Sequence, residues 1–398
     1  MDITIHPKKL SGTITAIPSK SQAHRLLICA AFSDAPTKLI CPAINQDIEA
    51  TAACLRALGA KITRSEDGYK VLPVKDLPHK AVLNCNESGS TLRFMLPITG
   101  ALGVDTTFEL AGRLPYRPLS PLWEELERMG CQLSRPTENT IRIEGKLRAG
   151  EYNIDGSVSS QFITGLLYAA ALMDGKSTIH VTGKLESRPY VEMTQHALAA
   201  FDVDSKDFTV IGSRPFRSPG KLAVEGDWSN GAFFLAAQKL GSDITVSGLL
   251  PHSSQGDRKC AELLTKLGDQ IIVDAADIPD LVPILAVTAG ALSGATFKNI
   301  ARLRLKESDR VATVAAMIES LGGKMAISEN EMQVFPGKYH GCTIDAAGDH
   351  RIAMAAAIAA TVADGPVTIL GAQCVAKSYP TFWEEYKKLG GSYEQYIR

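Results

Sequence analysis

The stretch Leu55-Arg-Ala-Leu-Gly59 ends an apolar, helix-like segment with a glycine, and a short strand-like segment follows. Similar helix ends recur along the chain, at Leu126-Glu-Arg-Met-Gly130, Leu198-Ala-Ala-Phe201, Leu264-Thr-Lys-Leu-Gly268, Ile318-Glu-Ser-Leu-Gly322 and Tyr386-Lys-Lys-Leu-Gly390. A glycine after the last apolar turn is the usual left-handed stop of a helix. Because the ends recur roughly every 55 to 70 residues, the pattern predicts six α/β units.

Strand-like segments lie between these helices, for example Thr140-Ile-Arg-Ile143, Thr178-Ile-His-Val181 and Ile244-Thr-Val246. The chain has 398 residues, of which 45% are hydrophobic. This length exceeds the range in which one hydrophobic core usually keeps growing. We therefore expect an α/β fold of two domains, with three units in each.

The charge balance argues against a polyanionic partner. The sequence has 42 Lys plus Arg and 43 Asp plus Glu, which gives a net charge of -1. No global field therefore attracts nucleic acid or an acidic membrane, and no basic run forms a stripe. The sequence contains none of the motifs GxxxxGK[ST], GxGxxG, HExxH and GxSxG. ATP, NAD and zinc are not implied, and we expect neither a cofactor nor a metal.

The eight cysteines are scattered, without metal-ligand spacing, so we expect free and mostly buried thiols. The N-terminus lacks a charged segment followed by an apolar one, which predicts a cytoplasmic protein. The apolar stretches Leu281 to Leu292 and Ile352 to Ala363 are too short to span a bilayer. They predict buried core helices.

Five further helix starts combine small or polar residues with a nearly all-apolar helix, and begin near Ser19, Glu87, Ser159, Gly226 and Gly348. Ser and Asp at such positions are ordinary N-caps. Helix N-termini also attract phosphate and carboxylate groups, through free N–H groups and the helix dipole. Four of these starts carry Lys, Arg, His or Gln, which favours anion binding.

Several charged residues have both a structural and a functional interpretation. One helix start carries Lys20, Ser21 and Arg25, and is either a phosphate-binding site or a solvated first turn. At another, Gly89 lacks a Cβ atom and allows a ligand to approach the backbone closely. Arg113 and Arg117 flank Pro115 in a loop. Their guanidinium groups either bind an anion there or remain solvated.

Lys306, Glu307 and Arg310 lie within one turn, which indicates either a surface salt bridge or a working acid held among cations. His350 and Arg351 sit at the start of an apolar helix, where charged groups favour a function. Taken singly, Lys377 and Asp280 are ordinary caps or surface charges.

Nine motifs in order resemble those of the EPSP synthase family (3-phosphoshikimate 1-carboxyvinyltransferases). They are SKSQAHR (19–25), ESGSTLRF (87–94), GRLPYRP (112–118), SSQF (159–162), SRPY (187–190), DIPD (277–280), LKESDR (305–310), GDHR (348–351) and AKSYP (376–380). Each motif alone is weakly specific, but the series covers nearly the whole chain.

The resemblance implies a two-domain inverse α/β barrel with six βαβαββ repeats, three per domain. Residues 1–17 and 223–398 are expected to form one discontinuous domain, and 18–222 an inserted domain. The active site is expected in the interdomain cleft, and the protein is expected to be a monomer.

The resemblance also implies site residues. Those expected to contact shikimate 3-phosphate are Lys20, Ser21, Arg25, Ser159, Ser160, Ser187, Tyr190, Asp280 and Lys306. Those expected to contact phosphoenolpyruvate are Lys20, Gly89, Arg93, Arg113, Gln161, Arg310, Asp349, Arg351 and Lys377. Asp280 and Glu307 resemble the family's proton acceptor and donor, assisted by Lys20 and His350. Arg302 stands where some members have a substrate-contacting Asn, and Glu87 and Ser90 also depart from the common pattern.

The implied reaction transfers the enolpyruvyl group of phosphoenolpyruvate to the 5-hydroxyl of shikimate 3-phosphate. Glyphosate is expected to occupy the phosphoenolpyruvate site. The rival UDP-N-acetylglucosamine enolpyruvyl transferases have a reactive Cys in a loop and a GKNA-type start. Here the loop Ala111 to Pro121 has no Cys, and the start is Ser19-Lys-Ser21. A second alternative, a non-catalytic binder of small anions, would need the basic residues but not Asp280 and Glu307.

Overall fold

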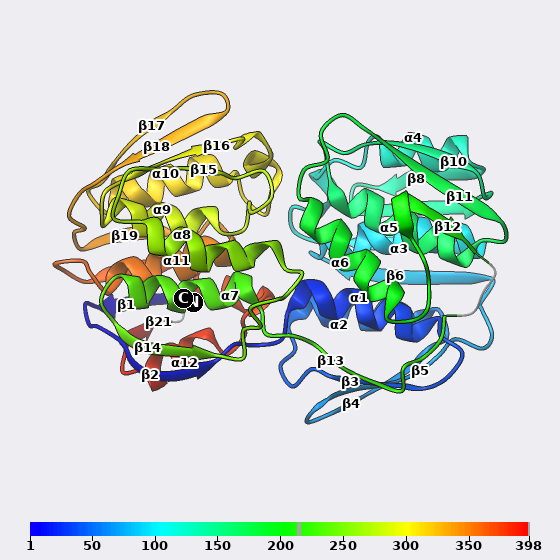
Figure 1. The fold of residues 1–398 in the computed structure, drawn as a ribbon, viewed down its shortest axis with the longest axis horizontal. Coiled ribbons are helices and arrows are strands. Elements are labelled where there is room, and N and C mark those ends of the chain that lie inside the picture. Colours follow the sequence, from blue (N-terminus) through cyan, green and yellow to red (C-terminus); the bar gives the residue numbers. More distant parts are fainter. Residues whose placement is uncertain (213–215, 397–398) are drawn as a thin grey trace. The chain divides into compact units, whose positions relative to one another are not determined.

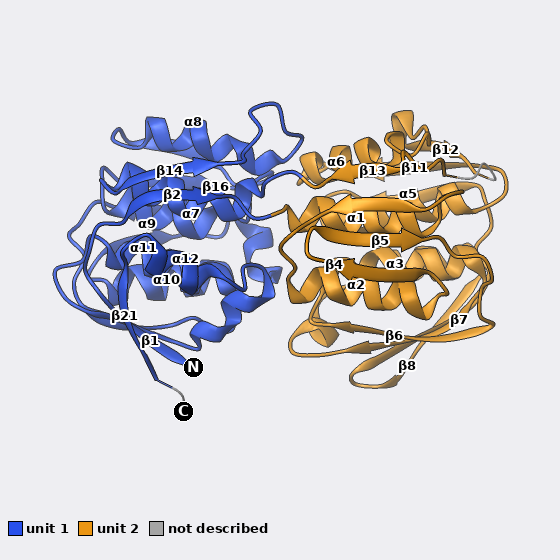
Figure 2. Ribbon diagram, turned by 90° about the horizontal axis from the view of Figure 1, so that it is seen from below, with its two compact units in different colours: residues 1–17, 225–398 blue, residues 18–224 orange. Residues whose placement is uncertain are grey.

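The chain divides into two compact units, drawn in different colours in Figure 2. The computed structural model describes residues 1–212 and 216–396. Unit 1 comprises Met1–Ile17 and Glu225–Arg398, and unit 2 comprises Pro18–Val224. The chain thus enters unit 2 once and returns once. That the two units act as domains sharing one active site stays a prediction.

Unit 2 contains three sheets, with strand orders β6-β7-β9-β8, β13-β3-β5-β4 and β10-β11-β12. Its strands are β3 (Thr37–Ile40), β4 (Lys61–Ser65), β5 (Gly68–Leu72), β6 (Lys80–Asn86), β7 (Asp105–Leu110), β8 (Cys131–Thr137), β9 (Thr140–Gly145), β10 (Glu151–Asp155), β11 (Lys176–Thr182), β12 (Thr209–Ile211) and β13 (Lys221–Ala223). Its helices are α1 (Lys20–Ala31), α2 (Gln46–Ala57), α3 (Gly89–Leu102), η1 (Leu114–Tyr116), α4 (Leu122–Arg128), α5 (Ser160–Leu172), α6 (Arg188–Ala199) and η2 (Lys206–Phe208).

Unit 1 also contains three sheets, with strand orders β19-β20-β1-β21, β15-β16-β18-β17 and β14-β2. Its strands are β1 (Asp2–His6), β2 (Ser11–Thr15), β14 (Asp243–Ser247), β15 (Ile271–Asp274), β16 (Ala295–Lys298), β17 (Lys324–Ile327), β18 (Glu331–Phe335), β19 (Cys342–Asp345), β20 (Val367–Leu370) and β21 (Ser392–Tyr396). Its helices are α7 (Trp228–Lys239), η3 (Gly256–Arg258), α8 (Lys259–Lys266), α9 (Val282–Gly290), η4 (Ala301–Leu305), α10 (Arg310–Ser320), α11 (His350–Ala360), η5 (Ala372–Lys377) and α12 (Phe382–Lys388).

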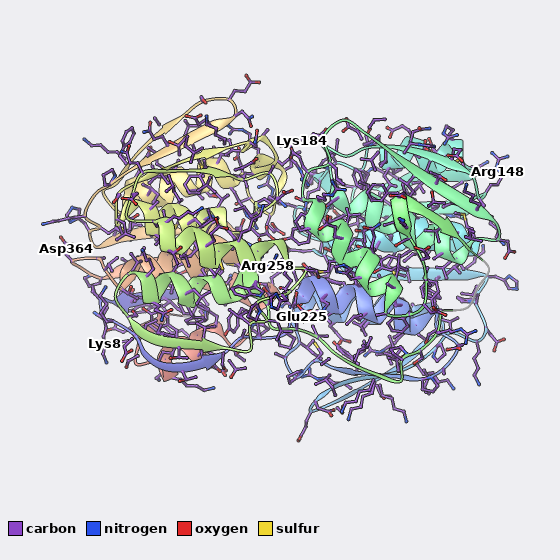
Figure 3. The ribbon with its side chains drawn as sticks, in the orientation of Figure 1. Lys8, Arg148, Lys184, Glu225, Arg258 and Asp364 are labelled. Atoms are coloured by element: carbon purple, nitrogen blue, oxygen red, sulfur yellow. The ribbon has the colours of Figure 1, made fainter. Side chains whose placement is uncertain are left out.

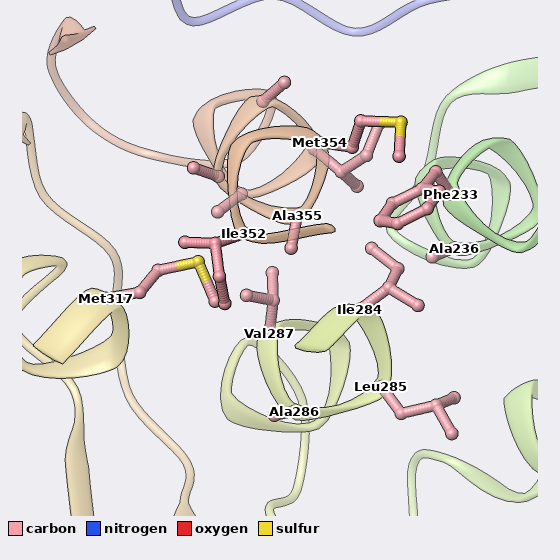
Figure 4. Packing of buried hydrophobic residues seen from close by; sticks show 14 of the residues in the cluster. Phe233, Ala236, Ile284, Leu285, Ala286, Val287, Met317, Ile352, Met354 and Ala355 are labelled. Atoms are coloured by element: carbon pink, nitrogen blue, oxygen red, sulfur yellow. The ribbon is translucent and has the colours of Figure 1, made fainter. Parts of the chain in front are cut away.

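The core of unit 1 is built around helices that are apolar on every face. Every residue of α9 and of α11 is buried. Figure 1 shows both helices between the sheets of unit 1, and Figure 4 shows Ile284 and Val287 of α9 facing α11. Helices buried on all sides have no polar face to present to water. Functional polar groups of such helices are therefore expected at the helix ends.

The predicted helix ends are confirmed. Helices α2, α4, α8, α10 and α12 each end within two residues before a glycine with positive φ, for example Gly59 at +106° and Gly322 at +86°. Helix α6 ends at Ala199, within the predicted Leu198 to Phe201 segment. The three quoted strand segments lie in β9, β11 and β14.

Two stretches of the chain have the order βαβαββ if short 3-10 helices are set aside. One runs from β6 through α3, β7 and α4 to β8 and β9, and the other from β15 through α9, β16 and α10 to β17 and β18. In both sheets the first two strands are parallel and the last two antiparallel. The fold is thus mixed α/β, and the full count of six such repeats stays a prediction.

The predicted N-caps are confirmed at five helices. Ser19, Ser88, Ser159, Asp227 and Asp349 cap α1, α3, α5, α7 and α11, and each side chain accepts a hydrogen bond from a backbone N–H of the first turn. A capped N-terminus fixes the direction of the remaining N–H groups. The candidate functional residues lie at or next to these and neighbouring helix starts.

Candidate active site

Arg310 is the centre of a charged cluster in unit 1. Its Nη1 lies 2.6 Å from Oδ1 of Asp280, its Nη2 2.8 Å from Oε2 of Glu307, and its Nε 2.8 Å from Oδ2 of Asp349. The Arg310 side chain is 1% exposed, whereas those of Asp280 and Glu307 are 22% and 16% exposed. The cation is therefore buried and fully charge-compensated, and two of its carboxylates still reach the surface of the unit.

Three helix starts bring this cluster together. Asp280 lies just before α9, Glu307 just before α10, and Asp349 is the N-cap of α11. Asp349 accepts a hydrogen bond from the backbone N–H of Arg351 at 3.0 Å, and another from the hydroxyl of Ser308 at 3.0 Å. Carboxylates at helix N-termini are stabilised by the helix dipoles. The predicted Glu307–Arg310 pair thus exists, but it is part of a buried network and not a solvated surface bridge.

Asp280 is surrounded by further cations. Nη2 of Arg351 lies 3.1 Å from Oδ2 of Asp280, and Nζ of Lys306 lies 4.0 Å from its Oδ1. Burial disfavours the ionised form of Asp280, but the charges of Arg351, Lys306 and Arg310 outweigh it and hold its pKa well below the usual range. Asp280 is therefore a carboxylate at neutral pH.

The other titratable groups of the cluster respond to the same field. Burial lowers the pKa of Lys306 to about 8, against the opposing charge of Asp280. Burial also raises the pKa of Asp349, but the charge of Arg310 overcomes this and the net shift is downward. Groups whose pKa is shifted by burial together with specific charges are typical of functional sites.

Asp257 is a buried carboxyl group that the sequence reasoning missed. It lies in η3, is 4% exposed, and burial together with the negative charge of Asp280 raises its pKa to about 7. The charge of Arg351 opposes this shift. Its segment, Gly256-Asp-Arg258, offers no spacing or composition that would have indicated the site.

His350 and Lys377 are buried in the same unit. His350 begins α11 and is 1% exposed, with Nδ1 4.0 Å from Oδ1 of Asp349. Lys377 is the last residue of η5 and is also buried. Arg302 lies in η4, where its charge helps to lower the pKa of Lys306. Arg302 is thus close enough to the cluster to influence it electrostatically.

A second cluster lies in unit 2, where α1 and α2 are joined by an ion pair. Nζ of Lys20 lies 2.8 Å from Oδ2 of Asp47, and both side chains are largely buried. Lys20 is the first residue of α1, and Asp47 lies in the first turn of α2. The predicted Lys20 therefore has a fixed position, held by a carboxylate that the sequence reasoning did not identify.

Arg25 ties α1 to α6. Its Nε donates to the hydroxyl of Thr194 at 2.9 Å, and its Nη2 to the backbone carbonyl of Tyr190 at 2.9 Å. Its Nη1 donates to the carbonyl of Ser21 at 2.6 Å, and the guanidinium lies over the ring of Phe94. These contacts bring the predicted residues Ser21, Arg25 and Tyr190 together.

Arg93 and Gln161 connect α3 with α5. Nη1 of Arg93 donates to Oε1 of Gln161 at 2.9 Å, and Nε2 of Gln161 donates to the hydroxyl of Ser90 at 2.9 Å. Nη2 of Arg93 donates to the carbonyl of Pro118 at 3.1 Å. Two residues 68 positions apart in sequence are thus held in one polar network.

Gly89 is approached by two guanidinium groups. A Cβ atom at Gly89 would lie 2.6 Å from Nη1 of Arg117 and 2.7 Å from Nη1 of Arg93. Arg113, the predicted residue in this loop, is exposed at the N-cap of η1. Both arginines lie in the same GRLPYRP motif, so the sequence indicated the loop but could not tell which arginine faces Gly89.

The remaining predicted residues of unit 2 lie at two helix starts. Ser159 caps α5, whose first residue is Ser160, and Ser187 occupies the N-cap position of α6 with φ of +55°. Ser160 and Ser187 are buried, whereas Ser159 and Tyr190 are partly exposed. Helix starts with partly exposed hydroxyl groups are suited to phosphate groups.

Outside these clusters the charges are dispersed. Side chains of both signs cover the two units, and Lys8, Arg148, Lys184 and Asp364 in Figure 3 are exposed examples. In residues 1–212 and 216–396, no group of three or more His, Cys, Asp or Glu side chains is placed to hold a metal ion. Among the helices of these residues, none is long and apolar enough to cross a membrane. All eight cysteines are free thiols, and six of them are buried.

Comparison with known proteins identifies relatives along the whole chain. The sequence pattern described as EPSP synthase (3-phosphoshikimate 1-carboxyvinyltransferase) matches residues 5–386. A 3-phosphoshikimate 1-carboxyvinyltransferase from Clostridium beijerinckii is 35% identical over 430 residues, which cover 99% of each chain.

Solved structures show the same fold at lower identity. EPSP synthase from Acinetobacter baumannii has a TM-score of 0.81 at 22% identity, with 99% of this chain and 100% of that chain covered. The enolpyruvyl transferase NikO from Streptomyces tendae has a TM-score of 0.75 at 17% identity, with 99% and 98% covered.

Proposed function

The chain belongs to the EPSP synthase (3-phosphoshikimate 1-carboxyvinyltransferase) family, and we propose that the residues of the two clusters carry out the family's reaction. As an enzyme of this family, it transfers the enolpyruvyl group of phosphoenolpyruvate to the 5-hydroxyl of shikimate 3-phosphate. The products are 5-enolpyruvylshikimate 3-phosphate and phosphate. This step belongs to the shikimate pathway of aromatic amino acid biosynthesis.

The observation that carries the residue roles is the binding of Arg310 by two partly exposed carboxylates, Asp280 and Glu307. In the free protein, N–H groups of Arg310 and Arg351 donate hydrogen bonds to these carboxylates. An anionic substrate group that binds either arginine competes for the same N–H groups. Loss of these charge-assisted hydrogen bonds raises the pKa of a carboxyl group. We propose that substrate binding in this way converts Asp280 and Glu307 from ion-pair partners into working bases and acids.

The reaction needs two proton transfers at carbon and one at oxygen. In the addition step the hydroxyl loses its proton and attacks C2 of phosphoenolpyruvate, while C3 gains a proton. Loss of phosphate then restores the double bond, and C3 gives a proton back. We assign the C3 proton to Glu307 and the hydroxyl proton to Asp280, with Lys20 and His350 assisting.

Unit 2 supplies most of the binding groups for shikimate 3-phosphate in this proposal. The helix starts at Ser21, Ser160 and Ser187 offer hydroxyl and backbone N–H groups, which suit its phosphate group. Most N–H groups of Arg25 donate to other groups of the protein, so its main contribution is to hold α6 against α1. The proposed set is completed by Lys20, Ser159 and Tyr190 of unit 2 and by Asp280 and Lys306 of unit 1.

For phosphoenolpyruvate we propose Lys20, Gly89, Arg93 and Gln161 from unit 2, and Arg310, Asp349, Arg351 and Lys377 from unit 1. Arg117 joins this set, because its guanidinium approaches Gly89 and Arg93. Arg113 remains in it as a residue of the same loop. These clustered positive charges offset the repulsion between the two anionic substrates. A surface without net local charge would not do so.

We further propose the finer architecture of the family, an inverse α/β barrel of six βαβαββ repeats with three per unit. The similarity to the Acinetobacter baumannii structure supports this arrangement. A cytoplasmic monomer acting on small molecules, without cofactor, nucleic acid or membrane partner, stays our prediction.

The test is phosphate release from phosphoenolpyruvate with shikimate 3-phosphate or UDP-N-acetylglucosamine as the acceptor. We expect phosphate release only when shikimate 3-phosphate is the acceptor. Release with the nucleotide sugar would assign the chain to the rival transferase chemistry. Binding of both substrates without any phosphate release would identify a non-catalytic binder of small anions.

A further inference from the structure

A chain of buried hydrogen bonds joins the first three helices of unit 2. Nδ1 of His24 in α1 lies 2.7 Å from the hydroxyl of Thr51 in α2, which lies 2.7 Å from the hydroxyl of Thr91 in α3. The Thr91 hydroxyl donates to the hydroxyl of Ser88, the N-cap of α3, at 2.8 Å. All four side chains are 0% exposed. Figure 2 shows the three helices in unit 2.

The donor count fixes the direction of this chain. A Thr hydroxyl has a single proton to donate. Thr91 uses its proton toward Ser88, so Thr51 must donate to Thr91. Thr51 then has no proton left for the imidazole, and Nδ1 of His24 must be the N–H donor. A neutral His24 is therefore the tautomer with hydrogen on Nδ1 and none on Nε2.

The surroundings of the imidazole agree with this tautomer. In the described part of the chain, Nε2 of His24 is buried without a hydrogen-bond partner. A bare lone pair tolerates this better than a buried N–H group. Burial lowers the pKa of His24 to about 3, and the charges of Lys20 and Arg25 add to this effect while Asp47 opposes it. The imidazole is therefore neutral throughout the neutral pH range.

We propose that His24 is a positioning residue, which starts a one-way hydrogen-bond chain that holds the first turns of α1, α2 and α3 in register. These turns carry Lys20, Asp47 and Gly89 respectively. The Lys20–Asp47 ion pair joins the starts of α1 and α2. The His24 chain joins the same two helices one turn further along and also connects them to α3. This inference rests on the proposed function, because it explains how groups assigned to phosphoenolpyruvate are held in place.

The spectroscopic test uses the whole protein with 15N-labelled histidine. The nitrogen chemical shifts of His24 should show a protonated Nδ1 and an unprotonated Nε2, unchanged between pH 6 and 9. The His24 signals are assigned by comparison with the His24→Asn variant. An Nε2–H tautomer, or a titration in this range, would overturn the proposal. This readout does not depend on turnover, so it judges the inference even if the wild type shows no enolpyruvyl transfer.

The kinetic test interrupts the chain at Thr51. Thr51→Val keeps the side-chain volume but removes the hydroxyl, which leaves a buried donor and acceptor unsatisfied. We expect kcat/KM for phosphoenolpyruvate to fall by about tenfold, and Thr51→Ser to restore it to within about twofold.

The matched control is Thr99→Val in α3, the helix that also carries Thr91. Thr99 is 0% exposed and donates to the carbonyl of Leu96 at 3.1 Å, near the other end of the helix. Loss of the Thr99 hydroxyl should lower the melting temperature, while kcat/KM stays within about twofold of the wild-type value. If Thr51→Val and Thr99→Val have equal effects on kcat/KM at equal loss of stability, His24 and Thr51 serve packing alone and the proposal is wrong.

Discussion

Oδ1 of Asp280 lies 2.6 Å from Nη1 of Arg310, and the arginine side chain is 1% exposed. This contact accounts for much of the behaviour expected of the unit 1 cluster. Together with the charges of Arg351 and Lys306, Arg310 lowers the pKa of Asp280 and keeps it ionised. The basicity of Asp280 therefore depends on what else binds these cations. In the proposed function, an anionic substrate that binds these cations would weaken their contacts with Asp280 and so make this carboxylate more basic.

Replacing Asp280 with Asn should remove the acceptor for the hydroxyl proton while keeping the size of the side chain. We expect kcat to fall by about 100 to 10,000-fold, which is the usual loss for a general base. Calorimetry should still detect binding of shikimate 3-phosphate, because the remaining cations are unchanged. Turnover within a few-fold of the wild type would remove Asp280 from this role.

Lys306 should give the enzyme an alkaline limit. Burial lowers its pKa to about 8, so the ammonium group loses its charge as the pH rises through this value. In the free enzyme we expect kcat/KM for shikimate 3-phosphate to decline above about pH 8. Lys306→Arg keeps the charge at higher pH and should shift the decline upward, whatever its effect on the plateau. Superimposable profiles would show that Lys306 does not cause the limit.

Asp257 should make the protein less stable as the pH rises. Its pKa is about 7 in the folded protein, against 3.8 as the ordinary value. The folded state therefore holds the proton more tightly, and the stability linked to it is lost between about pH 4 and 7. Asp257→Asn removes this ionisation. Its melting temperature relative to the wild type should increase from pH 5 to pH 8, and a difference independent of pH would contradict the assignment.

Gly89→Ala should disturb both arginines that approach this position. The added methyl group would lie within 2.7 Å of guanidinium nitrogens of Arg93 and Arg117, so these side chains must shift. We expect a higher KM for phosphoenolpyruvate and a larger increase in the inhibition constant of glyphosate, because a clash discriminates against the longer ligand. An unchanged ratio of the two constants would show that Gly89 does not line the site.

Local patterns in the sequence were sufficient to predict the secondary structure around the clusters. Glycine stops and Ser or Asp caps act within one helical turn, so their residues can be read directly. The same holds for Glu307 and Arg310, which are three residues apart on one turn.

The tertiary contacts of these residues could not be derived from local pattern. Asp280 and Asp349 are 30 and 39 positions away from Arg310, and no periodicity links them. Asp257 and the His24–Thr51–Thr91 chain are likewise products of helix packing. The choice between Arg113 and Arg117 depends on the path of one loop, because both flank Pro115 in the same motif.

The most direct test of the account follows the proton at C3. With phosphoenolpyruvate and shikimate 3-phosphate in deuterium oxide, the wild type should place deuterium at C3 of the product. In the proposed mechanism, Glu307 gives C3 a solvent-derived deuteron and then removes any of the three hydrogens of the resulting methyl group. Glu307→Gln should bind shikimate 3-phosphate but incorporate deuterium at least about 100-fold more slowly. Incorporation by Glu307→Gln at the wild-type rate would contradict the account.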